Sequence, residues 1–438
     1  MEYERSVSAP SHELSPETVW HIQMPQIRFG RNATDELAFQ LHDLGVDEGA
    51  HGLIVTDKNL ANIGHAGRIE DHLTENEFTV DIYDGSEREP SISAIENCLE
   101  FVRDEKSEAG YNFFVGLGGG SCLDTAKATR AVIANGGSPL DYIAEPTGEG
   151  KALDESGPPL VLMPTTAGTG AEISPVAILS VAEKDIKEGI SSNHIRADAA
   201  VLDPTLTTTL PPDLTAKTAM DALGHAMEGY TTHEYDSLLR PTDPAERPVY
   251  AGRTPLTEMF SKKAIDLLSN NVRKAVHNGD NLEARENMLQ GALFGAIAGL
   301  TAGASLCHAM AYPVGNKYHT YHGETIAVLT PASTIDYNSA NDPERFASLA
   351  RRFGVDTAGM NPREAADALK DEYVQLQRDL NVLPSGLNDL AGITEDEVDW
   401  LAKQTVDTQA RLLRCNPRPV TEEDVYDIFV DALYNWED

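Results

Sequence analysis

The sequence has few basic residues for the number of acidic residues that it carries. Among its 438 residues, 34 are lysine or arginine and 70 are aspartate or glutamate, so the formal net charge at pH 7 is −36. Nucleic acids and anionic membrane surfaces are bound through basic patches, and this charge argues against both as partners. Lysine is scarce and the acidic excess runs along the whole chain, which indicates a halophilic surface whose self-repulsion is screened by salt. An ordinary acidic cytoplasmic protein is the alternative.

Cysteine is also scarce. The four cysteines, Cys98, Cys122, Cys307 and Cys415, are too few and too scattered for a disulfide framework, and no CxxC pair indicates a thiolate zinc site. The N-terminus has no basic segment followed by an apolar core, so we expect no signal peptide. The uncharged stretch at 288–316 contains many small residues and a histidine, which favours a tightly packed buried helix over a membrane span. We therefore expect a cytoplasmic protein without a membrane partner.

Hydrophobic periodicity separates a polar start from an α/β part. Residues 1–23 are polar and are expected to form a loose arm. From 24 to 204, short apolar runs alternate with amphipathic helical segments. The apolar runs lie at 52–60, 78–85, 112–120 and 159–170. Nearly continuous apolar runs between helices are typical of a parallel sheet that helices cover on both faces, so this part is predicted to be an α/β domain.

Helical periodicity replaces the strand signals in the second half of the chain. The composition changes near the segment 202–213, which is rich in threonine and proline. Amphipathic or apolar helical patterns then recur at 213–232, 255–276, 284–310 and 362–380. Residues 205–438 are therefore predicted to form an all-helical domain.

Two polar turns follow apolar strands in the first domain. The turn at 116–121 opens a helix, so its glycines let the backbone approach a phosphate at a helix N-terminus. The turn at 164–170 supplies Thr165, Thr166 and Thr169, whose hydroxyls suit contacts with ribose, phosphate or a nicotinamide amide. Both turns lie where strands end, which is where open α/β sheets bind ligands. Glycines that serve only tight packing are the alternative, but the pair of turns favours nucleotide binding.

Asp57 ends another strand-like segment of the first domain. A carboxylate at that position can accept hydrogen bonds from both hydroxyls of an adenosine ribose and would repel a 2′-phosphate, which favours NAD over NADP. Taken alone, this aspartate is equally well explained as an Asx turn or a helix cap.

One aspartate and several histidines in the second domain form a candidate metal site. Asp221 and His225 are four residues apart, which places both on one face of a helix. His308 and His322 lie in uncharged segments near expected helix ends, and His319 competes with His322. Such oxygen and nitrogen ligands suit Fe²⁺ or Zn²⁺ with an open position for substrate. Spacing alone does not bring distant residues together, so ordinary core or surface histidines remain the alternative.

These residues lie in motifs that resemble those of a known family. The sequence reads GGGS at 118–121, PTTAGTGAE at 164–172, DALGHAMEGY at 221–230, LCHAMAYP at 306–313 and HG at 322–323. This set, in this order, is similar to that of the iron-containing (group III) alcohol dehydrogenases, from residue 27 to the end of the chain. Within that family, the segment 237–260 and Tyr312 most resemble the hydroxyacid–oxoacid transhydrogenases.

The resemblance implies a fold and a set of site residues. It implies an N-terminal Rossmann-like NAD-binding domain, a C-terminal helical domain, a cofactor cleft between them and at least a homodimer. The implied metal ligands are Asp221, His225, His308 and His322, so His322 is preferred to His319. The implied cofactor contacts are Asp57, Gly118, Gly119, Gly120, Ser121, Thr165, Thr166, Thr169 and Lys187.

One position departs from the pattern of many alcohol dehydrogenases in this family. They have a histidine four residues after the third metal ligand, on a proton path, and this chain has Tyr312 there. A tyrosine hydroxyl forms hydrogen bonds but is a weaker proton carrier near neutral pH. The departure favours the transhydrogenase subgroup, and we regard Tyr312 and His322 as candidate catalytic residues.

The resemblance implies hydride transfer between NAD and a small alcohol or hydroxyacid. In a transhydrogenase, a retained cofactor would take hydride from an acid such as 4-hydroxybutyrate and return it to an oxoacid such as 2-oxoglutarate. Because such substrates have carboxylates, Arg247 and Arg253 in the segment 237–260 are candidate substrate residues, with surface ion pairs as the alternative. A primary-alcohol dehydrogenase with freely exchanging cofactor and a non-catalytic nucleotide-binding relative are the other candidate functions.

Overall fold

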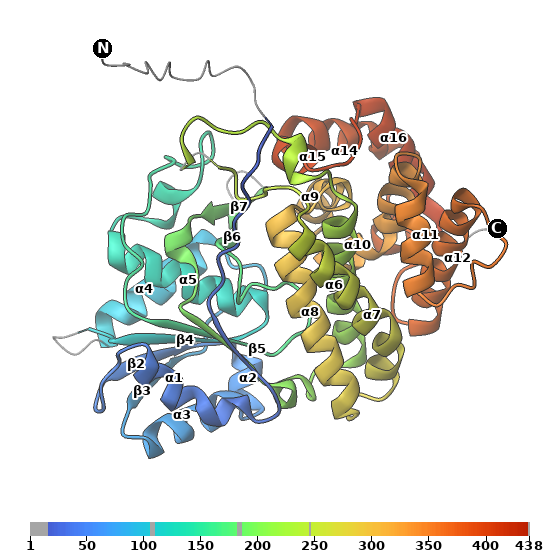
Figure 1. Cartoon of the computed structure of the whole chain (residues 1–438). Helices are drawn as coiled ribbons and strands as arrows, with labels where there is room; N and C mark the ends of the chain where they lie inside the picture. Colours follow the sequence, from blue (N-terminus) through green and yellow to red (C-terminus); the bar gives the residue numbers. More distant parts are fainter. Residues whose placement is uncertain (1–15, 106–109, 182–185, 245–246, 437–438) are drawn as a thin grey trace, which may run out of the picture.

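The computed structural model describes residues 16–105, 110–181, 186–244 and 247–436. A part made of strands and helices lies on one side of the molecule, and a helical part lies on the other (Figure 1). Most of the predicted loose arm, 1–23, lies outside the described residues. Within its described portion, Glu17 is buried and pairs with Arg247 at 2.9 Å. This portion is therefore held against the segment 237–260.

The first part is built on a six-stranded sheet with the strand order β1-β8-β5-β4-β2-β3. All the pairings within it are parallel. Its strands are β1 (Gln26–Phe29), β2 (His51–Val55), β3 (Thr79–Tyr83), β4 (Phe113–Gly118), β5 (Leu160–Pro164) and β8 (Ala199–Leu202). The predicted parallel sheet is confirmed, and β1 and β8 extend it beyond the four apolar runs.

Helices cover both faces of this sheet, as the apolar runs predict. The helices of this part are α1 (Leu37–Asp43), α2 (Lys58–Asn62), α3 (His65–Glu75), α4 (Ile92–Glu105) and α5 (Gly120–Asn135). Ile54 packs with α1 and α3, whereas its neighbour Leu53 packs with α4 and α5. Successive side chains of a strand point to opposite faces, so a sheet covered on both sides needs apolar residues at nearly every position.

An antiparallel hairpin, β6 (Val176–Val181) and β7 (Ile186–Ser191), lies outside the main sheet and is not predicted by the sequence patterns. A buried ion pair attaches it to α5. Lys127 Nζ lies 2.7 Å from Asp124 Oδ1 and donates a hydrogen bond to the Val176 carbonyl oxygen, and the Asp124 carboxylate accepts one from the backbone of β6. The hairpin is thus fixed against the helix that follows the glycine turn.

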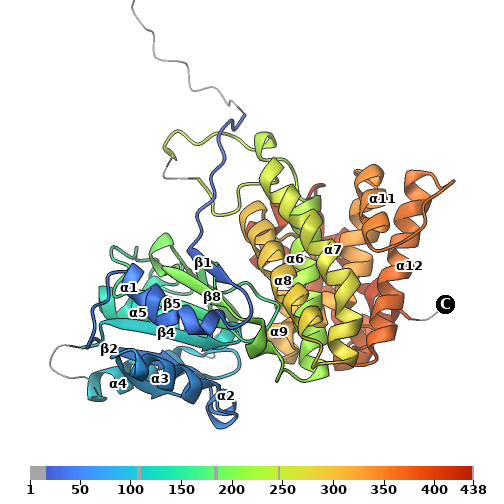
Figure 2. The same cartoon turned by 60° about the horizontal axis from the view of Figure 1, so that its bottom comes forward.

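The second part is helical over the described residues beyond β8. Its helices are α6 (Pro212–Thr231), α7 (Pro255–His277), α8 (Leu282–Ala302), α9 (Leu306–Tyr318), α10 (His322–Thr330), α11 (Pro343–Arg352), α12 (Pro362–Leu380), α13 (Leu387–Ala391), α14 (Glu395–Thr408), α15 (Ala410–Leu413) and α16 (Glu422–Asp431), with a π-helical turn, η8 (Pro331–Tyr337). The 3₁₀ turns that lie wholly within the described residues include η1 (Ala33–Glu36), η2 (Pro139–Tyr142), η4 (Asn193–Ile195), η5 (Pro204–Thr207), η6 (Tyr235–Ser237) and η9 (Ala432–Tyr434). Helices α11 and α12 lie on the side away from the sheet (Figures 1 and 2).

The helical pattern at 284–310 is divided between α8 and α9, which meet at an angle of 99°. Gly303 follows the end of α8 with a φ of +121°, which residues other than glycine rarely adopt. Apolar residues continue on both sides of this turn, so periodicity does not reveal it. No single helix in the described part of the chain is long and apolar enough to cross a membrane. The bent pair α8–α9 meets that criterion, by length and composition only.

Close contact between α6 and α8 depends on glycine. A Cβ atom on Gly299 would lie 2.7 Å from the His225 carbonyl oxygen and 3.0 Å from His225 Cα. A Cβ atom on Gly295 would lie 2.9 Å from the Ala222 carbonyl oxygen. These neighbours are backbone atoms, which cannot rotate away as the end of a flexible side chain would. Glycine therefore sets the distance between α8 and the helix that contains His225.

We expect Gly299→Ala to destabilise the protein by about 1–3 kcal/mol, the usual cost of forcing an extra methyl group into a packed core. Gly67→Ala in α3 is the matched control, because an added Cβ atom there meets nothing within 4 Å. Because alanine has a better helix propensity than glycine, Gly67→Ala should leave the stability unchanged or slightly higher. Denaturant unfolding midpoints of the two variants check this prediction. Equal midpoints would contradict it.

Candidate metal and cofactor site

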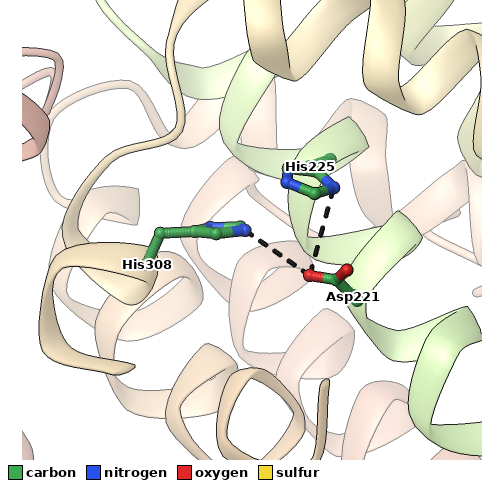
Figure 3. A group of neighbouring side chains, drawn as sticks. All are labelled: Asp221, His225 and His308. Carbon is green, nitrogen blue, oxygen red and sulfur yellow. Dashed lines mark ion pairs between the residues drawn. The ribbon is translucent and has the colours of Figure 1, made fainter. Parts of the chain in front are cut away.

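Asp221 and three histidines come together inside the helical part. His308 Nε2 and His322 Nε2 each lie 3.7 Å from Asp221 Oδ1, and His225 Nδ1 lies 4.0 Å from it. The rings of His225 and His308 stack with their centroids 4.6 Å apart. Figure 3 shows Asp221, His225 and His308 pointing toward one another. The structure thus brings together the four side chains that the resemblance implies as metal ligands.

Three facing atoms of this cluster have no hydrogen-bond partner among the described residues. They are Asp221 Oδ1, His225 Nδ1 and His308 Nε2, all of them buried and within 4.8 Å of one another. Buried polar atoms are nearly always paired, because leaving one unpaired costs free energy. A shared cation would satisfy all three at once. One carboxylate oxygen with imidazole nitrogens is a donor set that suits Fe²⁺ or Zn²⁺, so these residues fit a metal.

The ends of two helices bring His308 and His322 to α6, where Asp221 and His225 lie one turn apart. His308 lies in the first turn of α9, directly after the sharp turn that ends α8. His322 is the first residue of α10. His319 ends α9 in the left-handed conformation, with a φ of +53°, and its side chain is exposed. The chain reverses at this residue, and His322 is the histidine that faces the aspartate.

Glu228 belongs to this site but is not among the residues predicted from the sequence. Its Oε2 atom lies 2.5 Å from His308 Nδ1, and the carboxylate also accepts hydrogen bonds from two backbone N–H groups and from the Ser305 hydroxyl. It therefore holds the His308 ring with Nε2 facing Asp221, as carboxylates commonly do behind metal-binding histidines. The available signal is an acidic residue in helical register with Asp221 and His225 on an otherwise apolar face.

Burial and mutual contact shift the pKa values of the histidines. Burial lowers the pKa of His225 and of His322 to about 4, against the attraction of Asp221. Burial also disfavours the charged form of His308, but Glu228 and Asp221 outweigh it and raise the pKa to about 9. His225 and His322 are therefore neutral near pH 7 and offer lone pairs. At His308, a cation would compete with a proton for Nε2.

One cavity of about 370 Å³ is lined by both parts of the molecule. The predicted site residues that line it from the helical part are Asp221, His225, His308, Tyr312 and His322. Those that line it from the first part are Gly119, Gly120, Ser121, Thr166, Thr169 and Lys187. A more open depression of about 670 Å³ beside the start of α7 is lined by Arg253 and by no other predicted site residue. The histidine cluster and the two polar turns thus open to the same cleft.

The glycine turn leads directly into α5. Gly119 is the N-cap of this helix, and no side chain caps it, so the first N–H groups remain available to an anion. Gly118 has a φ of +150°, and a Cβ atom on Gly120 would lie 2.8 Å from Thr169 Oγ1. Backbone conformation and close packing therefore require Gly118 and Gly120, whereas Gly119 leaves the helix end open. Backbone conformation and packing thus explain Gly118 and Gly120, and phosphate binding at the open helix end stays a prediction.

Of the remaining predicted cofactor residues, Gly118, Thr165 and Asp57 are not part of the cleft lining, whereas Lys187 is. Thr165 is buried, and its N–H donates to the Gly118 carbonyl oxygen at 3.0 Å. Asp57 caps α2, since its Oδ1 atom accepts a hydrogen bond from the backbone of that helix at 2.9 Å. Lys187 lines the cleft from β7 and pairs with Glu89 at 2.9 Å.

The two arginines predicted to bind substrate lie elsewhere. Arg247 pairs with Glu17 at 2.9 Å, and Arg253 pairs with Glu234. Neither lines the cleft, whereas Arg88 and Arg411 do. Arg247 and Arg253 are thus found in ion pairs, which is the alternative stated for them above.

Comparison with protein-family models now identifies the family. Residues 25–204 match the model for iron-containing alcohol dehydrogenase, and residues 246–433 match the C-terminal model of the Fe-containing alcohol dehydrogenase family. The chain belongs to the iron-containing alcohol dehydrogenase family. It is an oxidoreductase that acts on CH–OH groups, and the prediction of family and reaction class from the motifs is confirmed.

Individual proteins of known sequence or structure also match nearly the whole chain. The chain is 31% identical over 440 residues to the mitochondrial hydroxyacid-oxoacid transhydrogenase of Xenopus tropicalis, covering 97% of this chain and 93% of that protein. It is 32% identical over 409 residues to long-chain-alcohol dehydrogenase 1 of Geobacillus thermodenitrificans, covering 93% of this chain and 95% of that protein. The crystal structure of sulfoacetaldehyde reductase from Bifidobacterium kashiwanohense in complex with NAD+ is similar with a TM-score of 0.78 and 25% identity, covering 96% of this chain and 100% of that chain.

Glu228→Gln is expected to weaken Fe²⁺ or Zn²⁺ binding by about 10- to 100-fold, the usual effect of removing the carboxylate behind a metal-binding histidine. His225→Ala removes a ligand and should weaken binding further. His319→Ala is the matched control, because its side chain is exposed and does not line the cleft. Metal content is measured after dialysis against graded concentrations of chelator. If His225→Ala and Glu228→Gln retain metal as the control does, the assignment is wrong.

Proposed function

We propose that the protein transfers hydride between NAD and a small alcohol or hydroxyacid, with a divalent metal held by Asp221, His225, His308 and His322. One observation carries this proposal. The unpaired buried atoms of the metal cluster and the two polar turns of the sheet open to a single cleft. Hydride transfer requires substrate carbon and nicotinamide ring in contact, and a shared cleft meets that requirement.

The metal would lower the pKa of the substrate alcohol, and NAD would accept the hydride, chemistry that side chains cannot supply. The protein's own contribution is to hold the ligands in place. Desolvation within the site lowers the pKa values of His225 and His322 to about 4, so both stay neutral near pH 7 and their lone pairs are available. Glu228 fixes the ring of His308. This donor set accepts either Fe²⁺ or Zn²⁺.

Tyr312 is proposed to position the substrate oxygen. It follows His308 by one helical turn, and its ring centroid lies 5.8 Å from that of His322. Burial raises the pKa of Tyr312 to about 12. The hydroxyl therefore keeps its proton near neutral pH, where it donates a hydrogen bond rather than accepting a proton. His322, between Tyr312 and Asp221, is the half-exposed ligand and is placed beside the reacting atoms in this proposal.

The two turns and Asp57 are proposed to hold the cofactor. The uncapped start of α5 suits the pyrophosphate, with Ser121 as a side-chain donor, and Thr166 and Thr169 suit the nicotinamide side. Asp57 caps α2 with one carboxylate oxygen and lies at the end of β2, where ribose hydroxyls would be bound and a 2′-phosphate repelled. The NAD+ complex of the sulfoacetaldehyde reductase supports this choice of cofactor.

Transhydrogenase activity is the more specific proposal. The relative from Xenopus tropicalis matches nearly the full length of the chain, and Tyr312 replaces the histidine that many alcohol dehydrogenases of the family use. The second candidate is an alcohol dehydrogenase with freely exchanging cofactor, and the long-chain-alcohol dehydrogenase of Geobacillus thermodenitrificans supports it at similar identity. The homodimer, the cytoplasmic location and a domain boundary at 204 stay predictions.

Purified protein loaded with Fe²⁺ or Zn²⁺ should oxidise 4-hydroxybutyrate without added NAD when 2-oxoglutarate is supplied. A retained cofactor is reduced by the first acid and reoxidised by the second, so no external NAD is consumed. Formation of 2-hydroxyglutarate measures the turnover. A strict requirement for added NAD would support the freely exchanging dehydrogenase instead. No turnover of any alcohol with metal and NAD present would support a non-catalytic nucleotide-binding relative.

We also propose that the acidic surface is adapted to salt. With a formal net charge of −36, mutual repulsion of carboxylates opposes folding, and salt screens that repulsion. The thermal midpoint should rise as KCl is increased from about 0.1 M to about 3 M. Sucrose is the control, because it favours the folded state without screening charge. A midpoint that rises with sucrose and not with KCl would contradict the proposal.

A further inference from the structure

One corner of the cleft contains a cation without an assigned role. Tyr250 from the segment 237–260, Tyr312 from α9 and Arg411 from α15 line the same cavity as His308 and His322. Arg411 Cζ lies 5.1 Å from the centroid of the Tyr250 ring. Arg411 also acts electrostatically on the hydroxyls of both tyrosines. The guanidinium group of Arg411 thus belongs to the wall that the helical part contributes to the cleft.

The wall beneath this cation is apolar. Tyr250, Ala304 and Leu412 line the cavity and belong to a small buried apolar cluster, with Tyr312 packed against it. Ligand sites typically combine such apolar walls with a few polar groups that fix orientation. An apolar wall beside one guanidinium group matches a short carbon chain that ends in a carboxylate.

Arg411 is exposed and forms no ion pair with any described residue, although the chain contains 70 acidic residues. Among the described residues, no carboxylate oxygen lies within the ion-pair distance of 4.0 Å from its guanidinium group. Arg247 and Arg253, by contrast, are both held in ion pairs. In a protein with this excess of acid, an arginine that lines a cleft and has no ion pair among the described residues is available to an anionic ligand.

We propose that Arg411 binds the carboxylate of the substrate and sets a preference for hydroxyacids over neutral alcohols. This inference rests on the proposed function, because it takes the substrate hydroxyl to lie at the histidine cluster. The carbon chain then runs past Tyr312 along the apolar wall. The planar guanidinium group offers two parallel N–H donors to a carboxylate, and the Tyr250 hydroxyl lies beside it.

Glu188 on β7 is the acidic group that competes for Arg411. It acts electrostatically on the guanidinium group from beyond ion-pair distance. Arg411 could therefore join the two parts of the molecule instead of binding substrate. The two roles differ in one measurable respect, because a structural contact affects all substrates equally, whereas a carboxylate subsite affects only acids.

The test compares Arg411→Ala with the wild-type holoenzyme on 4-hydroxybutyrate and on 1-butanol, which have four carbons each and differ in the carboxylate. We expect kcat/KM for 4-hydroxybutyrate to fall about 10- to 100-fold, mainly through KM, as is typical when hydrogen bonds between charged groups are lost. The value for 1-butanol should stay within about twofold. Arg411→Lys keeps the charge and should recover part of the loss. Arg414→Ala, exposed and outside the cleft lining, should change neither value.

Inhibition by butyrate separates this inference from the proposed function. Butyrate should inhibit 1-butanol oxidation by the wild type and should inhibit Arg411→Ala about 10- to 100-fold less strongly, whether or not the cofactor exchanges. Equal losses on both substrates, or unchanged butyrate inhibition in Arg411→Ala, would overturn the carboxylate subsite. If the wild type oxidises neither alcohol with metal and NAD supplied, the proposed function fails. Calorimetric titration of butyrate into both metal-loaded proteins then still decides the role of Arg411.

Discussion

The helical part holds one carboxylate and three imidazoles close together, and the facing atoms of Asp221, His225 and His308 all lie within 4.8 Å of one another. Asp221 Oδ1, His225 Nδ1 and His308 Nε2 are shielded from water, and no described group donates a hydrogen bond to them. Leaving a buried polar atom unpaired costs on the order of 1–3 kcal/mol. A bound cation removes this cost for all three atoms at once. Metal binding and folding of this part are therefore expected to be coupled, because without the cation these unpaired buried atoms destabilise the folded state.

The backbone around these ligands is shaped by turns rather than by long regular helices. The 99° turn between α8 and α9 places His308 at the start of a helix, beside α6. The reversal at His319 places His322 at the start of the next helix. Gly299 lets α8 lie against the backbone of His225 at a distance that no other residue permits. The positions of His308 and His322 thus depend on turns a few residues before them, and that of His225 depends on a glycine of the neighbouring helix α8.

The sequence predicted the elements with strong local signals and missed those without them. The sheet was recognisable because its strands are covered on both faces and are apolar at nearly every position, as the opposite packing of Leu53 and Ile54 shows. The hairpin β6–β7 lacks such a run and is held by the Lys127–Asp124 pair, a tertiary contact. The turn at Gly303 was hidden because the residues before and after it are equally apolar.

By itself, the sequence determined the fold class, the family and the pairing of Asp221 with His225, since periodicity, motif order and i,i+4 spacing are local properties. The family resemblance implied that His308 and His322 join this pair, but spacing did not, and only the tertiary structure showed that they meet it and that Glu228 supports His308. It also decided that Arg411 lines the cleft whereas Arg247 and Arg253 lie in ion pairs outside its lining. These outcomes depend on which segments pack together across hundreds of residues, and spacing along the chain does not encode that proximity.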